Sequence, residues 1–130
     1  MSAQPEVLVV DDERSMRELL SDVLEAEGYA VQVAENGQRA LEILASSRPD
    51  VVVLDLMMPV LDGWAFMERY RDIAGVEIPI IGVSAILTPP VADELRGRGV
   101  RACIPKPFDV GDLVDSVSSA VQQRARLAQP

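Results

Sequence analysis

The feature that most constrains this chain is an apolar run that ends on an acid. Residues 51–54 are Val-Val-Val-Leu, and Asp55 follows directly. Such a run is typical of a strand buried on both faces, as in a parallel sheet. A carboxylate that closes this strand costs free energy unless a cation or a hydrogen-bond donor pairs with it. We therefore expect Asp55 to belong to a polar site at the edge of the core.

Strand and helix patterns alternate five times along the 130 residues. The expected strands are 6–10, 31–33, 51–54, 80–83 and 102–104. Each is followed by apolar residues at helical spacing, with Asn36, Asp62 and Thr88 as expected N-caps. Ile73 is expected on the buried face of the third helix and Val91 on that of the fourth. This order predicts an α/β domain: a doubly wound, five-stranded parallel sheet with helices on both faces.

The length fits one domain. We expect it to span residues 6–122, after an N-terminal extension over 1–5. From Gln122 onward the apolar stripe of the last helix is lost, so residues 123–130 are expected to be a tail or the start of a linker.

Composition excludes several classes of protein. The net charge of −9 disfavours direct binding to nucleic acid or to an anionic membrane and favours a protein partner or a cation. The absence of histidine excludes a His-based catalytic triad. The single cysteine, Cys103, excludes an internal disulfide and fits a reducing compartment. No secretory signal and no apolar run near the ~20 residues of a membrane helix are visible, so we expect a cytoplasmic protein.

Polar residues close four of the expected strands, in a chain with a single lysine. They are Asp11 and Asp12, Asp55, Ser84 and Lys106. The carboxyl ends of parallel strands share one edge of the sheet, so these side chains are expected to converge there. Two unit charges ~4 Å apart interact by roughly 4 kcal/mol at an effective dielectric near 20, so three carboxylates need a cation or a proton. Oxygen ligands of this kind suit Mg²⁺.

These parts can make a phosphoryl-transfer site. A carboxylate such as Asp55 can attack phosphorus. Mg²⁺, the Lys106 ammonium, the Ser84 hydroxyl and backbone amides near Leu56, Met57 and Ala85 can stabilise the phosphoryl oxygens.

The same segments resemble the receiver domain of two-component response regulators. They are Val-Val-Asp-Asp-Glu at 9–13, Asp-Leu-Met-Met-Pro at 55–59 with Asp62-Gly63, Val-Ser-Ala at 83–85 and Pro-Lys-Pro-Phe at 105–108. The resemblance covers residues 6 to about 122 and implies a flavodoxin-like (βα)5 fold with strand order 2-1-3-4-5.

The resemblance also implies a function and a ligand set. Asp55 would accept a phosphoryl group from a histidine kinase or phosphotransfer protein. Asp12 would bind Mg²⁺ directly and Asp11 through water, with Asp55 and the Met57 backbone carbonyl as further ligands. Ser84 and Lys106 would contact the phosphoryl group. The domain would catalyse only its own phosphorylation and dephosphorylation and would not be a turnover enzyme.

By the same resemblance, a face built from the fourth helix, fifth strand and fifth helix would bind a downstream effector, a linked output domain or a second copy. One position departs from the family pattern, which usually has Tyr or Phe three residues before the lysine. Here that residue is Cys103. The usual coupling of the hydroxyl to an aromatic ring is therefore not expected.

Other interpretations remain open. Asp11 and Asp12 could simply cap the first helix. A phosphatase of the haloacid dehalogenase type would need a second acid at Met57, which cannot carry a proton. A flavodoxin-like cofactor binder would need a phosphate loop where this chain has acids. A degenerate receiver that binds partners without phosphorylation is the fourth alternative. The sequence leaves the kinase, the output and the oligomeric state undecided.

Overall fold

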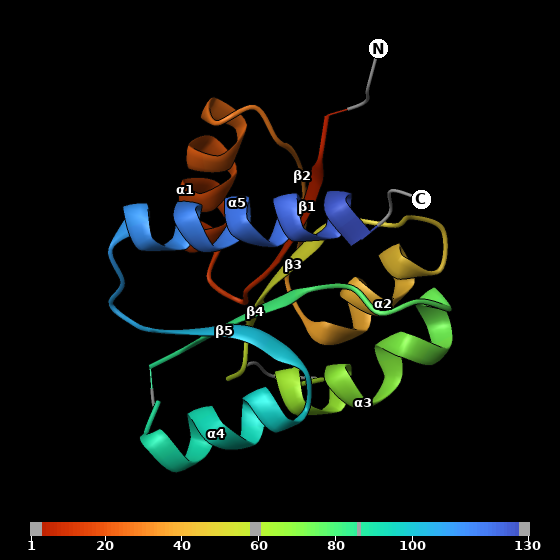
Figure 1. Cartoon of the computed structure of the whole chain (residues 1–130), viewed down its shortest axis with the longest axis vertical. Helices are drawn as coiled ribbons and strands as arrows, with labels where there is room; N and C mark the ends of the chain where they lie inside the picture. Colours follow the sequence, from red (N-terminus) through yellow and green to blue (C-terminus); the bar gives the residue numbers. More distant parts are fainter. Residues whose placement is uncertain (1–3, 58–60, 86, 128–130) are drawn as a thin grey trace.

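The computed structural model describes residues 4–57, 61–85 and 87–127, with side chains up to residue 123 (Figure 1). The strands are β1 (Glu6–Val10), β2 (Ala30–Ala34), β3 (Val51–Asp55), β4 (Ile80–Ser84) and β5 (Val100–Pro105). The helices are α1 (Arg14–Ala26), α2 (Gly37–Leu44), α3 (Gly63–Ala74), α4 (Pro89–Gly97) and α5 (Val110–Leu127). This order is the expected fivefold strand-and-helix alternation.

The five strands form one parallel sheet in the order β2-β1-β3-β4-β5, which confirms the expected fold. Helices α1 and α5 cover one face, and α2, α3 and α4 cover the other (Figure 1). The strand order reverses between β1 and β3, and a crevice at the carboxyl ends of the strands is expected at such a point.

Alternate residues of the central strands supply two separate cores. In β1, Val7 and Val9 pack in the cluster with α1 and α5, whereas Leu8 and Val10 pack in the cluster with the other three helices. All five residues of β3 are buried, as its apolar run predicts, and Asp55 is among them. The buried strand β3 therefore places the Asp55 carboxylate at the carboxyl edge of the sheet.

The three expected N-caps are confirmed. Asn36 accepts a hydrogen bond from the amide of Arg39 at 2.8 Å, and Asp62 accepts one from Ala65 at 3.0 Å. The Thr88 hydroxyl accepts one from Val91 at 3.4 Å. These side chains satisfy amides that have no partner within the helix.

One expectation about a helix face is wrong, for Ile73, and another, for Val91, is met only in part because Val91 packs against the core but is not fully buried. Ile73 is 39% exposed, because α3 buries Phe66, Met67, Tyr70 and Ala74, and this stripe leaves Ile73 at its margin. In α4, Ala92 is buried and Val91 is only half-buried. Apolar residues at the margin of a stripe are not distinguished from the stripe by spacing alone.

Two element ends differ from expectation as well. Strand β5 spans six residues, longer than the expected 102–104. Helix α5 continues to Leu127, so residues 123–127 are a continuation of the helix; residues 128–130 of the expected tail or linker lie outside the described residues. Among the residues described, no helix is both long and apolar enough to cross a bilayer.

Candidate functional site

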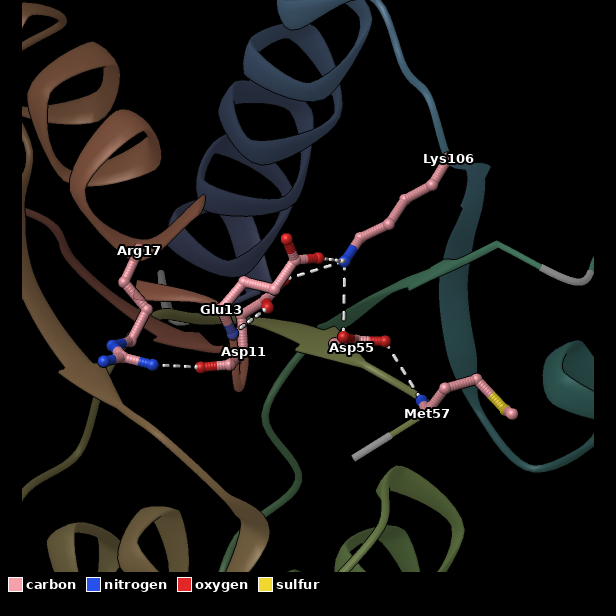
Figure 2. A network of polar contacts seen from close by, with 6 residues as sticks. All are labelled: Asp11, Glu13, Arg17, Asp55, Met57 and Lys106. Atoms are coloured by element: carbon pink, nitrogen blue, oxygen red, sulfur yellow. Dashed lines mark hydrogen bonds and ion pairs between the residues drawn. The ribbon is translucent and has the colours of Figure 1, made fainter. Parts of the chain in front are cut away.

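Three strand ends bring a lysine between two buried acids (Figure 2). Asp11 follows β1, Asp55 ends β3 and Lys106 follows β5. The Lys106 ammonium donates to Asp11 Oδ2 at 3.0 Å and to Asp55 Oδ2 at 3.3 Å. The peptide bond from Lys106 to Pro107 is cis. Residues that lie far apart in the sequence therefore meet at one point, as expected from their positions at the carboxyl edge.

Burial sets the electrostatics of this group. Asp11 and Asp55 are only 2% and 5% exposed. Loss of solvation on burial raises the pKa of Asp55, and the Met57 amide and Lys106 oppose this only in part. Burial alone would lower the pKa of Lys106, but its hydrogen bond to Asp11 and the charges of Asp11 and Asp55 raise it overall. The ammonium therefore stays protonated at neutral pH.

The acids can also hold a metal ion. One carboxylate oxygen from each of Asp11, Asp12 and Asp55 can be chosen so that all three lie within 4.8 Å of one another. Asp12 is exposed while the other two are buried, so the group opens to solvent on one side. An all-oxygen, partly open set of this kind fits Mg²⁺, which retains several waters when bound to protein. The chemistry of the donors therefore agrees with the expected metal.

Of the two backbone amides that follow Asp55, one faces the site and the other belongs to the sheet. The amide of Met57 donates to Asp55 Oδ1 at 3.0 Å, so it faces the site. The amide of Leu56 donates to the Val83 carbonyl at 3.1 Å and belongs to the sheet. The expectation that Leu56 supplies an amide to the site is therefore wrong, because pairing between β3 and β4 extends one residue beyond Asp55.

Ser84 lies at the end of β4, where it is 2% exposed. Its carbonyl accepts a hydrogen bond from the Lys106 amide at 2.8 Å, which joins the serine to the segment that carries the lysine. Ser84 therefore lies at the same edge of the sheet as the acids. Met58 and Pro59, quoted above in the sequence resemblance, lie outside the described residues.

Residues 7–118 match the family model described as the response regulator receiver domain. The chain belongs to this family. Response regulator MprA of Mycolicibacterium vanbaalenii is 41% identical over 110 residues, which is 83% of this chain and 46% of that protein. MprA of Mycobacterium ulcerans gives the same identity and the same coverage. The chain thus spans about half the length of the curated relatives it matches.

Solved receiver structures agree. The receiver domain of the Francisella response regulator 1452 superposes with a TM-score of 0.87 at 29% identity, over 92% of this chain and 98% of that one. Vibrio cholerae chemotaxis protein CheY4 gives 0.82 at 30% identity, over 91% and 99%. The resemblance noted in the sequence is confirmed. The receiver-domain family is not a classical enzyme family.

The receiver site includes two residues that sequence reasoning missed. Glu13 Oε1 lies 3.9 Å from the Lys106 ammonium, and the Glu13 amide donates to Asp11 Oδ1 at 2.9 Å. Arg17 Nη1 donates to the Asp11 carbonyl at 2.8 Å. Glu13 could have been suspected from its place beside two acids. Nothing in the spacing of α1 distinguished Arg17 from the other arginines.

The alternative that Asp11 and Asp12 merely cap the first helix does not describe the receiver. The N-cap of α1 is Glu13, and it makes no side-chain cap bond. Asp11 instead turns one oxygen to Lys106. Its position is therefore that of a site residue.

Close packing joins the start of α3 to the segment after Asp55. The amide of Gly63 donates to the Leu56 carbonyl at 3.3 Å. A Cβ atom at Gly63 would lie 2.8 Å from the Leu56 Cα and 3.1 Å from the Asp55 carbonyl oxygen. Only glycine allows this approach, which places α3 directly against the acceptor strand.

The position where an aromatic ring is usual holds a thiol that packs against the core. Cys103 is half-buried on β5 and packs against the core cluster on the side of α2, α3 and α4. Burial raises the pKa of its thiol, which makes it a poor nucleophile at neutral pH. The structure therefore gives Cys103 the character of a small apolar residue.

Proposed function

We propose that Asp55 of this receiver domain accepts a phosphoryl group from the phosphohistidine of a sensor kinase or phosphotransfer protein. The observation that carries the proposal is the contact of the buried Asp55 carboxylate with the ammonium of the half-buried Lys106, at 3.3 Å, at the carboxyl edge of the sheet. A small acyl phosphate is an alternative donor for the same chemistry.

In the transfer step, a carboxylate oxygen of Asp55 attacks phosphorus and forms a P–O bond. The P–N bond to the donor histidine breaks, and the imidazole takes up a proton from solvent. In the separate dephosphorylation step, water attacks the phosphorus of the acyl phosphate and the P–O bond to Asp55 breaks. Inorganic phosphate leaves, keeping the second proton of the water, and the carboxylate is regenerated. The raised pKa of Asp55 makes this oxygen more basic than that of a solvated aspartate.

Other residues of the site bind and orient the group. Lys106 would move from Asp11 or Asp55 to a phosphoryl oxygen, and its raised pKa keeps the charge in place. Ser84 would donate its hydroxyl to a second oxygen, and the Met57 amide would remain directed at the acceptor. The contact of Ser84 and Lys106 through the backbone supports their acting together.

Asp11, Asp12 and Asp55 would hold Mg²⁺, with the Met57 carbonyl as a further ligand. The spacing of the three carboxylates and the exposure of Asp12 support this assignment. When bound, the ion neutralises charge that the acids and the phosphoryl oxygens would otherwise bring together.

Phosphorylation would change the binding of a partner. A receiver of residues 6–122 would act on an effector protein, or on an output domain linked after it, through the face of α4, β5 and α5. A second copy on this face is a further candidate. The coverage of about half of the curated relatives supports a linked output domain. The charge of −9 disfavours nucleic acid on the receiver itself. With Cys103 on β5, the change would pass through the β4–α4 loop and α4 without an aromatic ring, or through another face of the domain.

Intact-mass spectrometry after incubation with acetyl phosphate tests the acceptor. One phosphoryl adduct that requires Mg²⁺ is expected, and Asp55→Asn should abolish it. Asp62→Asn is the matched control, because Asp62 caps α3 outside the site and asparagine caps equally well. An adduct that survives in Asp55→Asn would move the acceptor elsewhere. No adduct from either acetyl phosphate or a phosphorylated phosphotransfer protein would support the degenerate receiver instead.

A further inference from the structure

Asp11 is held by all four of its polar atoms. Its amide donates to the Ala34 carbonyl at 3.1 Å. Its carboxylate oxygens accept from the Glu13 amide at 2.9 Å and from the Lys106 ammonium at 3.0 Å. Its carbonyl accepts from Arg17 Nη1 at 2.8 Å. The orientation of this metal-site carboxylate therefore depends on contacts on both sides of the chain.

Arg17 supplies a hydrogen-bond donor to the Asp11 carbonyl, which the pairing of the sheet does not reach. Pairing of β1 ends at Val10, which lies opposite Ala34 in β2 and Leu54 in β3. The Asp11 carbonyl thus lies beyond the strand, in a residue that is 2% exposed. A buried carbonyl without a donor costs free energy, and the half-buried Arg17 side chain supplies the donor from α1.

Arg17 approaches from the side of Asp11 that faces away from Lys106 (Figure 2). The two cations therefore bind different parts of Asp11: Arg17 donates to its main-chain carbonyl, and Lys106 donates to its carboxylate. Lys106 has to leave Asp11 if it moves to a phosphoryl oxygen. Arg17 has no such role, so its contact can persist while the site changes state.

We propose that Arg17 is a positioning residue for the metal site. It fixes the Asp11 main chain, so that the carboxylates of Asp11 and Asp12 are directed to the cation before it binds. This inference rests on the proposed function, because it assumes that these acids bind Mg²⁺. It adds a residue on α1 that touches neither the metal nor the phosphoryl group.

The charge of Arg17 acts in the opposite direction from its hydrogen bond. A cation near the acids repels Mg²⁺, so its removal by itself would tighten metal binding. This repulsion acts through solvent and is screened by salt, whereas the loss of a fixed backbone geometry is not. Measurements at two ionic strengths therefore separate the two effects.

The test is a calorimetric titration of the protein with MgCl₂ at low salt and at about 0.5 M NaCl, where the screening length is only a few ångström. Arg17→Met should weaken binding about fivefold at the higher salt, as expected for one lost hydrogen bond. Arg17→Lys, which keeps a charged donor, should recover most of the loss. Arg14→Met is the matched control, because Arg14 forms a surface ion pair with Glu18 and its loss should leave Mg²⁺ affinity at the higher salt unchanged.

A second readout uses phosphorylation by acetyl phosphate. Arg17→Met should raise the Mg²⁺ concentration for half-maximal rate about fivefold and change the rate at saturating Mg²⁺ by less than about twofold. A role confined to fold stability would shift neither quantity at a temperature where circular dichroism shows every variant folded. Arg17→Gln, too short to reach the carbonyl, gives the same test should the methionine variant fail to fold.

The outcomes are distinct. Wild-type affinity in Arg17→Met, or tighter binding that disappears at high salt, would overturn the positioning role and leave the proposed function intact. Absence of Mg²⁺ binding in the wild type would overturn both. Weaker binding that persists at high salt, with recovery in Arg17→Lys, would support the inference.

Discussion

The guanidinium of Arg98 lies over the ring of Trp64, with its central carbon 5.0 Å from the ring centroid. Trp64 is the second residue of α3 and Arg98 is the C-cap of α4, so the contact joins two helices on one face of the sheet. Arg98 also pairs with Glu94 at 3.2 Å and with Glu68 at 3.7 Å. The Arg98 carbonyl accepts a hydrogen bond from Arg71 at 3.0 Å. The carboxyl end of α4 is therefore tied to α3.

Removal of this contact should destabilise the fold. Arg98→Ala is expected to lower the free energy of unfolding by about 1 kcal/mol, mainly through the lost cation–π contact. Arg96→Ala is the matched control near the same end of α4, because the Arg96 side chain forms an ion pair with Asp93 at 3.6 Å in which both side chains are exposed. It should cost less than about 0.5 kcal/mol. Urea denaturation compares the two variants, and equal losses would contradict the importance of the Trp64 contact.

A methyl group at Gly63 should damage both stability and the site. Its Cβ would lie 2.8 Å from the backbone of Leu56, next to the acceptor Asp55. Gly63→Ala is therefore expected to cost about 2 kcal/mol by overpacking and to weaken Mg²⁺ binding through a displaced Asp55.

Gly97→Ala is the control for this prediction. Gly97 lies in α4, with nothing within 4 Å of an added Cβ. The change should raise stability by up to about 1 kcal/mol, because alanine favours the helix. Thermal unfolding of both variants checks the pair. If Gly63→Ala has wild-type stability and Mg²⁺ affinity, the backbone near Leu56 can move to accommodate the methyl group and the prediction is wrong.

Asp55→Asn should stabilise the protein at neutral pH when Mg²⁺ is absent. Burial raises the pKa of Asp55 above its ordinary 3.8, so the folded state favours the protonated form. Between 3.8 and the folded pKa, rising pH therefore lowers the stability of the wild type, and above the folded pKa the full cost is present. Asparagine has no such cost and can keep the acceptor for the Met57 amide. The expected gain is on the order of 1 kcal/mol.

The pH and metal dependence check this assignment. In urea titrations from pH 4 to 8, the advantage of Asp55→Asn should grow with pH and then level off. Saturating Mg²⁺ should shrink it, because only the intact carboxylate set gains from metal binding. If the stability difference between Asp55→Asn and the wild type does not change with pH, it arises from packing and not from the charge of Asp55.

Lys106→Met should have the opposite effect on stability. The ammonium is 14% exposed and is the cation between Asp11 and Asp55. Its loss leaves two buried carboxylates without the cation between them, which should cost about 3 kcal/mol at neutral pH without metal. Mg²⁺ should bind more tightly to this variant than to the wild type and recover most of the stability.

The raised pKa of Lys106 also predicts how the stability of the wild type depends on pH above neutrality. Its pKa is raised in the folded state above the ordinary 10.5. The stabilisation it supplies should therefore be complete below pH 10.5 and be lost only as pH rises through the folded value. Calorimetric unfolding at neutral pH with and without MgCl₂ tests the variant. A loss of stability that Mg²⁺ cannot recover would show that the methionine fails for steric reasons.

Local patterns were sufficient for the framework of this receiver. The apolar run before Asp55 is a fully buried strand, and Asn36, Asp62 and Thr88 cap helices as their spacing predicts. Such features depend on neighbours a few residues away, so they are visible in the sequence. The convergence of Asp11, Asp55 and Lys106 followed from a single added rule, that the ends of parallel strands share an edge.

What the sequence determined is the set of strands and helices, their order and the residues placed at the carboxyl edge. The partners of those residues were decided by the tertiary structure. Lys106 meets Asp11 across 95 positions, Arg17 grips the Asp11 carbonyl, and the Leu56 amide is taken by β4. Such contacts depend on strand register and on the angle at which each helix crosses the sheet. Both are set by the packing of the whole core, and no local pattern encodes them.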